Sequence, residues 1–309
     1  MPTGECIKAN FIIIGTNPIE EVPSIGGIIP ASPVAQCCAK TTFFASTPSD
    51  DVLKNDKTSF LWPLSPLVSA AEMTLQKANA SGTFVDVQTL NDNDYGTFYP
   101  LNFNSDDDNR KYIGYLLDMR LVILDDGAGL YRVKNVITTI LGNKSLYSNE
   151  FCLSEYSPAL INGTVRIETY TNGIRGAAGS QTDFIDFNSI NWYNQIRLSG
   201  MFGFTSSEYT REEVEYNNGQ KQWVVDEQKE KYILKLKPIE QATRNFVKTD
   251  ILQADEIIVT DYNNTNPDEF IGVYVKGSGG FEPRHNIKEA LPVDINFDSA
   301  FNNQRKRRC

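Results

Sequence analysis

The stretch EVEYNNGQKQWVV, residues 213–225, indicates the class of fold. Glu213-Val214-Glu215-Tyr216 precedes Asn217-Asn218-Gly219-Gln220, and Lys221-Gln222-Trp223-Val224-Val225 follows it. Asn-Gly readily adopts the positive φ angles of a type I′ turn, which joins two antiparallel strands. The stretch therefore predicts a β-hairpin.

Similar short runs, rich in Val, Ile, Phe, Tyr and Thr and bounded by turn residues, recur along the chain. In Thr164–Tyr170, Val165 and Ile167 should face one way and Arg166 and Glu168 the other, which predicts a half-buried strand. One helix is expected over residues 238–247, where apolar residues follow helical spacing. We expect a mainly β protein of β-sandwich or barrel-like domains with one or two short helices. Further strands are predicted at residues 11–14, 73–77, 83–87, 121–124, 131–136, 231–236, 257–260, 271–276 and 293–297.

The length of 309 residues suits one large or two ordinary domains. Residues 15–65 are rich in proline and show little periodicity, so we expect a long extended arm that gains order by packing on a neighbouring chain. Ser-Pro and Asn-Gly pairs between residues 157 and 162 are typical of a boundary. The expected domains are residues 1–157, β-rich with the arm, and residues 158–309, β-rich with a basic C-terminal tail.

Charge and hydropathy exclude two classes of partner. The chain has 29 basic and 39 acidic groups and a formal charge of −10, which disfavours specific binding to nucleic acid. The apolar stretches are shorter than the roughly 20 residues of a membrane helix, and we expect no export signal. The five cysteines are irregularly spaced, which favours reduced thiols in a cytoplasm.

No residue pattern indicates catalysis or a cofactor. The lone histidine, His285, lies in a polar stretch without a nucleophile elbow nearby. The acidic stretches 91–96 and 106–108 lack the ligand register of an EF-hand, and zinc-type cysteine pairs do not occur. With 39 acids, carboxylate pairs suited to glycosidase chemistry are always available, so they carry no specific support. We expect no enzyme, no cofactor and no metal site.

Six residues are candidates for an interface. Trp192 and Trp223 are suited to stacking on a sugar or filling an interface pocket, although packing in a core is the commoner fate of tryptophan. The cations Arg305, Lys306, Arg307 and Arg308 suit DNA binding, a nuclear signal, or docking on an acidic neighbour in a homo-oligomer. We favour the last.

The C-terminal two thirds of the chain, from about residue 112, resembles a known group of virion proteins. The similarity lies in the following stretches: FCL at 151–153, TVRIE at 164–168, NWYNQIRLSGMFG at 191–203, DEIIVTDYN at 255–263 and NNQRKRRC at 302–309. Together they resemble structural tail proteins of tailed bacteriophages, namely the crAss-like and related phages of Bacteroidales.

The resemblance implies a non-enzymatic subunit of a virion tail, assembled in the host cytoplasm. It would form a ring or neck with copies of itself, contact neighbouring tail or portal-side proteins, bind no membrane, and contribute to a genome-ejection conduit. The alternative hypothesis is a baseplate-type protein that binds or hydrolyses carbohydrate at the host surface.

Overall fold

The computed structural model describes residues 41–46, 52–64, 68–91, 94–102, 111–140, 142–172, 174–176, 184–186, 192–239, 247, 251–263, 270–278, 291–301 and 303–306. Most of these residues are in strands, which confirms the mainly β fold. The chain divides into two compact units: unit 1, residues 1–161 and 170–197, and unit 2, residues 162–169 and 198–309. This division differs from a single boundary after residue 157, because the chain enters unit 2 at residue 162, returns to unit 1 at 170, and leaves it again after 197.

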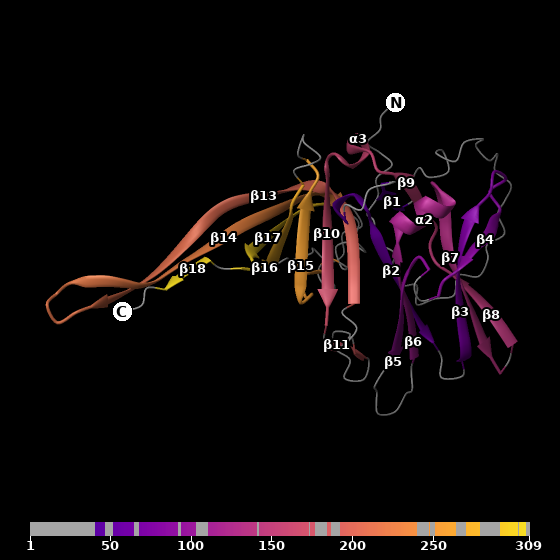
Figure 1. Cartoon of the computed structure of the whole chain (residues 1–309), viewed down its shortest axis with the longest axis horizontal. Coiled ribbons are helices and arrows are strands. Elements are labelled where there is room, and N and C mark those ends of the chain that lie inside the picture. Colours follow the sequence, from indigo (N-terminus) through magenta and orange to yellow (C-terminus); the bar gives the residue numbers. More distant parts are fainter. Residues whose placement is uncertain are drawn as a thin grey trace. The chain divides into compact units, whose positions relative to one another are not determined.

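Unit 1 is built from three sheets within the described residues (Figure 1). The six-stranded sheet has the order β1-β9-β7-β3-β4, with β8 also paired to β7. The β1–β9 pair is parallel, whereas β9–β7, β7–β3, β3–β4 and β7–β8 are antiparallel. The three-stranded sheet has the order β2-β6-β5, and β11 pairs with β12. The bounds are β1 Thr41–Ala45, β2 Lys57–Leu64, β3 Val68–Ala78, β4 Phe84–Thr89, β5 Gly96–Asn102, β6 Lys111–Asp118, β7 Gly129–Thr139, β8 Gly142–Tyr147, β9 Phe151–Glu155, β11 Ile174–Gly176 and β12 Phe184–Asp186.

Short helices connect some of these strands: η1 (Val52–Lys54), α2 (Met119–Asp126) and α3 (Pro158–Ile161). The strand predicted over residues 121–124 is wrong, because these residues belong to α2. The Asp118 carboxylate accepts a hydrogen bond from the Arg120 N–H and caps the start of α2, and Gly127, at φ 72°, ends it. A short apolar run is compatible with either a strand or a helix. Here the capping residues on both sides of the run favour the helix.

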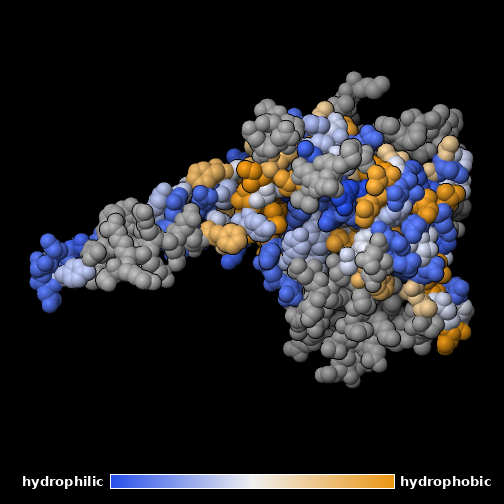
Figure 2. Space-filling view, in the orientation of Figure 1, coloured by the Kyte–Doolittle hydropathy of each residue, from blue (hydrophilic) through white to orange (hydrophobic). Residues whose placement is uncertain are grey.

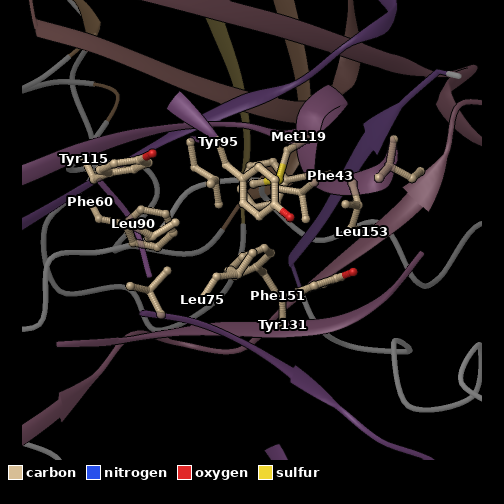
Figure 3. Close-up of a cluster of buried hydrophobic side chains, with 14 of the residues drawn as sticks. Phe43, Phe60, Leu75, Leu90, Tyr95, Tyr115, Met119, Tyr131, Phe151 and Leu153 are labelled. Carbon is tan, nitrogen blue, oxygen red and sulfur yellow. The ribbon is translucent and has the colours of Figure 1, made fainter. Parts of the chain in front are cut away.

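The core of unit 1 is centred on the ring of Phe151 in β9 (Figure 3). Phe43 packs edge-on against it with ring centroids 5.5 Å apart, and Tyr131 stacks on it at 6.0 Å. Phe60 of β2 approaches from the three-stranded sheet, also at 6.0 Å. The core therefore joins β1, β7 and β9 of one sheet to β2 of the other.

Part of the predicted N-terminal arm, residues 15–65, belongs to this core. β1 and β2 lie within that range, and Phe43, Phe44 and Phe60 are buried. Adjacent Phe43 and Phe44 are both covered, so β1 lacks the apolar–polar alternation by which a half-buried strand is recognised. Residues 15–40 of the predicted arm lie outside the described residues.

A buried ion pair joins distant segments of unit 1. Asp56 is 0% exposed and Arg197 is 1% exposed. Arg197 Nη2 lies 2.6 Å from Asp56 Oδ1, and Nε lies 3.3 Å from Oδ2. Asp56 Oδ2 also accepts the Phe44 N–H at 2.9 Å. The paired geometry and the extra donor compensate for the loss of hydration of both charges.

Unit 2 is built on a closed sheet. The strand order is β13-β10-β15-β16-β17-β14-β18, and β13 also pairs with β14, so six strands form a ring and β18 lies outside it. This closure confirms the barrel-like architecture expected from the sequence. β10 and β13 each also contribute residues to unit 1. The bounds are β10 Thr164–Thr171, β13 Trp192–Glu215, β14 Lys221–Ile239, β15 Glu256–Asp261, β16 Gly272–Gly277, β17 Leu291–Ser299 and β18 Asn303–Lys306.

Most strands predicted in unit 2 are confirmed, and two details are corrected. In β10, Arg166 is buried together with Val165 and Ile167, so the strand is covered on both faces rather than half-buried. Arg166 Nη2 is 2.8 Å from Glu168 Oε2, which partly neutralises the buried cation. In the predicted helix 238–247, Pro238 and Ile239 belong to β14, whereas Val247 is helical, and residues 240–246 are outside the described residues.

One cysteine departs from the expected reduced state. Cys152 lies fully buried in β9 and is disulfide-bonded.

Candidate assembly interface

The predicted hairpin around Asn218 and Gly219 is confirmed, and it is much longer than the sequence indicated. Its register runs from Gly200 opposite Leu236 to Glu215 opposite Lys221. At the turn, Gly219 has φ 75° and donates its N–H to the Tyr216 carbonyl at 2.8 Å. In β13, residues 192–200 are mostly buried, whereas residues 203–210 are exposed or half-buried on both faces. No alternation of burial therefore identifies this outer length of the strand from sequence.

The outer part of this hairpin, residues 207–230, continues past the ring of unit 2, and is called the outer hairpin below (Figure 1). β17 pairs with β14 over Lys231–Ile239. On the other side, β10 begins at Thr164, next to the hydrogen bond from the Gly200 N–H to the Gly163 carbonyl. Beyond Gly200, the described chain gives β13 one strand neighbour, β14. A two-stranded ribbon is marginally stable in water, so this extension gains from a further partner.

β18 pairs with the outer hairpin along β14. Its antiparallel register places Arg305 opposite Asp226 and Lys306 opposite Val225. Two of the four predicted interface cations are thus in a strand of their own chain, and Arg307 and Arg308 lie outside the described residues. β18 is the last strand of the sheet: β14 is its sole strand neighbour in the part of the chain that the structure describes.

The two sides of this three-stranded region differ in charge. Residues 208–215 of β13 contain four glutamates and one arginine, a net charge of −3. On the opposite side, β18 contributes Arg305 and Lys306, and Arg307 and Arg308 follow directly in sequence. One edge of the sheet is therefore acidic and the other basic.

Ion pairs fix the base of the outer hairpin. Lys231 Nζ is 2.9 Å from Glu208 Oε2 across β13 and β14, and the hydrogen bond to Glu208 raises the pKa of Lys231. Lys229 Nζ is 2.5 Å from Asp298 Oδ2, which links β14 to β17. Partial burial acts to raise the pKa of Asp298, but the hydrogen bond and charge of Lys229 outweigh it, and that pKa is lowered.

An aromatic row leads from the ring interior to the base of the hairpin. Phe202 is buried and stacks on Tyr232 with centroids 5.2 Å apart, and Phe204 meets the same Tyr232 ring edge-on at 6.0 Å. Phe204 is 58% exposed, so the row ends at the surface. Burial and a hydrogen bond to Glu230 raise the pKa of Tyr232 to about 12. Figure 2 shows apolar residues gathered near the base of the hairpin and a hydrophilic tip.

The two predicted tryptophans have different outcomes. Trp192 is 4% exposed and packs over Gly114 in unit 1, so it is a core residue and provides no interface surface. Trp223 lies opposite Glu213 in the outer hairpin, within the proposed interface region, although its side chain is outside the described part. Sequence reasoning missed the two strand edges that lack a further neighbour among the described residues, because strand pairing between distant segments leaves no local pattern.

Another polar cluster lies at the end of α2. The Tyr95 hydroxyl donates to Asp126 Oδ2 at 2.9 Å, and Lys77 donates to the Asp126 carbonyl. Tyr131 donates to the Gly127 carbonyl. Burial raises the pKa values of Tyr95 and Tyr131, so both phenols remain protonated at neutral pH and act as hydrogen-bond donors. The cluster ties α2 to β3, β7 and the strand connection at Tyr95.

Other predicted features gain no support as sites. His285 and residues 106–108 lie outside the described residues, as do two positions of the stretch 91–96. Among the described residues, no group of three or more His, Cys, Asp or Glu side chains is arranged to hold a metal ion. None of the described helices is long and apolar enough to span a bilayer. No protein-family model and no curated protein matches the sequence.

Proposed function

We propose that the protein is a non-enzymatic structural subunit of a bacteriophage tail, which forms a ring or neck with copies of itself. The observation that carries the proposal is the outer hairpin. It extends a closed sheet by a narrow ribbon, and among the described strands neither the β13 side of this ribbon nor β18 on its other side has a further neighbour. The phage context is suggested by the sequence resemblance described above.

A ribbon of this kind suits assembly better than catalysis. Natural proteins cover, shorten or charge exposed strand edges, because open edges pair with other chains. Here the two edges are charged with opposite signs. Such edges resist indiscriminate association and still permit pairing with one complementary surface.

The acidic balance fits a conduit for DNA. The formal charge of −10 makes the surface repel phosphate on average. DNA that passes through a ring of these subunits would therefore form few of the phosphate contacts that release counterions and strengthen binding. We therefore propose a neutral or negative lumen. Four of the 29 basic residues, 305–308, are adjacent near the C-terminal end, and we assign them to protein contacts.

The alternative of a glycan-binding baseplate protein has weaker support. Trp192, one of the two tryptophans considered for sugar stacking, is buried in unit 1. No structural observation favours the other, Trp223, as a sugar platform.

The test is the state of the purified full-length chain. Sedimentation velocity and native mass spectrometry over a wide concentration range, at low and moderate salt, should show a closed oligomer, and negative-stain images should show rings. A chain that stays monomeric under all these conditions contradicts the proposal. Binding or cleavage of capsular polysaccharide by the monomer would favour the baseplate alternative.

A further inference from the structure

We infer that the acidic β13 edge of the outer hairpin pairs with the basic β18 edge of a second copy of this chain. The inference rests on the proposed function, and it adds the contact surface and the symmetry of the assembly. The partner is another copy because both halves of the contact are present on the same chain, at opposite sides of one three-stranded region.

The first argument comes from the sheet. At residues 225–228 of β14, β13 lies on one side and β18 on the other. Beyond Gly200, β13 pairs with β14 alone among the described strands, and β18 likewise pairs with β14 alone. Each outer strand thus has one side directed away from β14. Strand addition at such a side provides main-chain hydrogen bonds without any rearrangement of the donor sheet.

The second argument comes from charge, and it decides the symmetry. Pairing two β13 edges would place residues 208–215, net charge −3, against the same residues of the other copy. Pairing two β18 edges would place Arg305 and Lys306 against themselves. Like charges directly opposite each other on paired strands are destabilising, whereas opposite charges are favourable. The favourable combination is β13 with β18.

This combination is a heterologous contact. One copy presents a surface that differs from the surface it meets, so each bound copy still has one β13 edge and one β18 edge to offer. Such contacts close into rings when the rotation between neighbours permits it, and otherwise give open filaments. A two-fold dimer, in contrast, would use one edge twice. The edge charges therefore favour a cyclic assembly.

The contact also accounts for the placement of the basic tail. Glu208 and Glu213 are paired with Lys231 and Lys221 of their own chain. We therefore assign the contact with the neighbour to the other two glutamates of this edge, Glu212 and Glu215. On β18, Arg305 and Lys306 lie at the outermost position of the sheet. The pairing depends on opposite charges at the surface, so added salt should weaken it.

Charge reversal in the full-length chain tests the contact. The basic-edge variant is Arg305→Glu with Lys306→Glu, and the acidic-edge variant is Glu212→Lys with Glu215→Lys. Each alone should lower the association constant by more than about tenfold, because it places like charges on both edges. An equimolar mixture of the two variants should recover assembly, since each then meets a complementary edge on the other. One chain carrying all four substitutions should also assemble.

The matched control is Lys144→Glu with Lys276→Glu, which changes the net charge as much as the basic-edge variant does. Both lysines are exposed, and they lie on β8 and β16, which belong to neither of the two edges. This control should assemble as the wild type does. Far-ultraviolet circular dichroism and the thermal midpoint show whether each variant is folded, and the four-substitution chain provides a second test if a single-edge variant is not.

The outcomes separate the two proposals. If the wild type forms rings and both edge variants form them equally well, the edge contact is wrong and the ring function stands. Loss of assembly in the control to the same extent, or failure of the mixture and of the four-substitution chain to recover it, also overturns the edge contact. A wild type that never assembles overturns both proposals.

Discussion

Replacing Asp56 or Arg197 should show how strongly unit 1 depends on its buried ion pair. Asp56→Asn removes the negative charge that faces the guanidinium, and Arg197→Met removes the positive charge while the carboxylate still accepts the Phe44 N–H. The side chain of Asp56 cannot turn out to water easily, since its own N–H donates to the Phe44 carbonyl and its carbonyl accepts the Met119 N–H. The backbone N–H and the backbone carbonyl of Asp56 are therefore both fixed by hydrogen bonds within the fold.

The expected magnitude follows from this confinement. Removing one member of a buried ion pair costs about 3–5 kcal/mol of unfolding free energy, because the other charge stays desolvated and uncompensated. The double variant Asp56→Asn with Arg197→Met buries no charge. It should cost about 1–3 kcal/mol, the penalty for amide hydrogen-bonding groups that lose a partner. We expect the double variant to be at least as stable as either single variant.

Urea unfolding, followed by circular dichroism and by tryptophan fluorescence, measures these differences. The matched control is Glu208→Gln, which makes the same change of carboxylate to amide in an exposed ion pair and should cost far less. The reasoning is refuted if the losses of unfolding free energy in the two single variants add up to the loss in the double variant. It is also refuted if the single variants are as stable as the control.

Three further predictions concern packing, an unmatched amide and pH. Gly114→Ala should destabilise unit 1 by about 1–3 kcal/mol, because its Cβ would lie 2.9 Å from Trp192 Cζ3, while Gly203→Ala, with no atom within 4 Å, should avoid this clash. Asn135→Leu should leave stability unchanged or raise it by up to about 1–3 kcal/mol, since the fully buried amide has no hydrogen-bond partner among the described residues. Asp298→Asn should lower stability by about 0–1 kcal/mol at pH 7. The folded-state pKa of Asp298 is lowered, so this difference should vanish as the pH falls below about 4 and through that pKa.

Thermal and urea unfolding check all three. An Ala variant at Gly114 as stable as the Gly203 control would contradict the close approach of the indole. A clear loss of stability in Asn135→Leu would show that the amide is satisfied, for example by a buried water. An Asp298→Asn difference that grows on acidification would reverse the expected sign and exclude the assigned role of Lys229.

The sequence predicted parts of the candidate interface and not its geometry. The Asn218-Gly219 turn was found because a positive φ at glycine is a local requirement. Arg305 and Lys306 were chosen because four adjacent cations depart from an acidic average. Their pairing with Asp226 and Val225 was not predictable, since strand neighbours about 80 positions apart in sequence are joined by folding alone.

The sequence by itself determined the mainly β class, most strand positions and the hairpin turn, because alternation, β-branched residues and turn glycines act over a few residues. The tertiary structure decided how the strands were used. It closed the ring through β13 and β14, buried Arg166 beside Glu168, placed Trp192 in the core, and turned the apolar run after Asp118 into a helix. Each of these outcomes depends on which distant segment removes a side chain from water or supplies its hydrogen bond, and that selection is made by the whole packed chain.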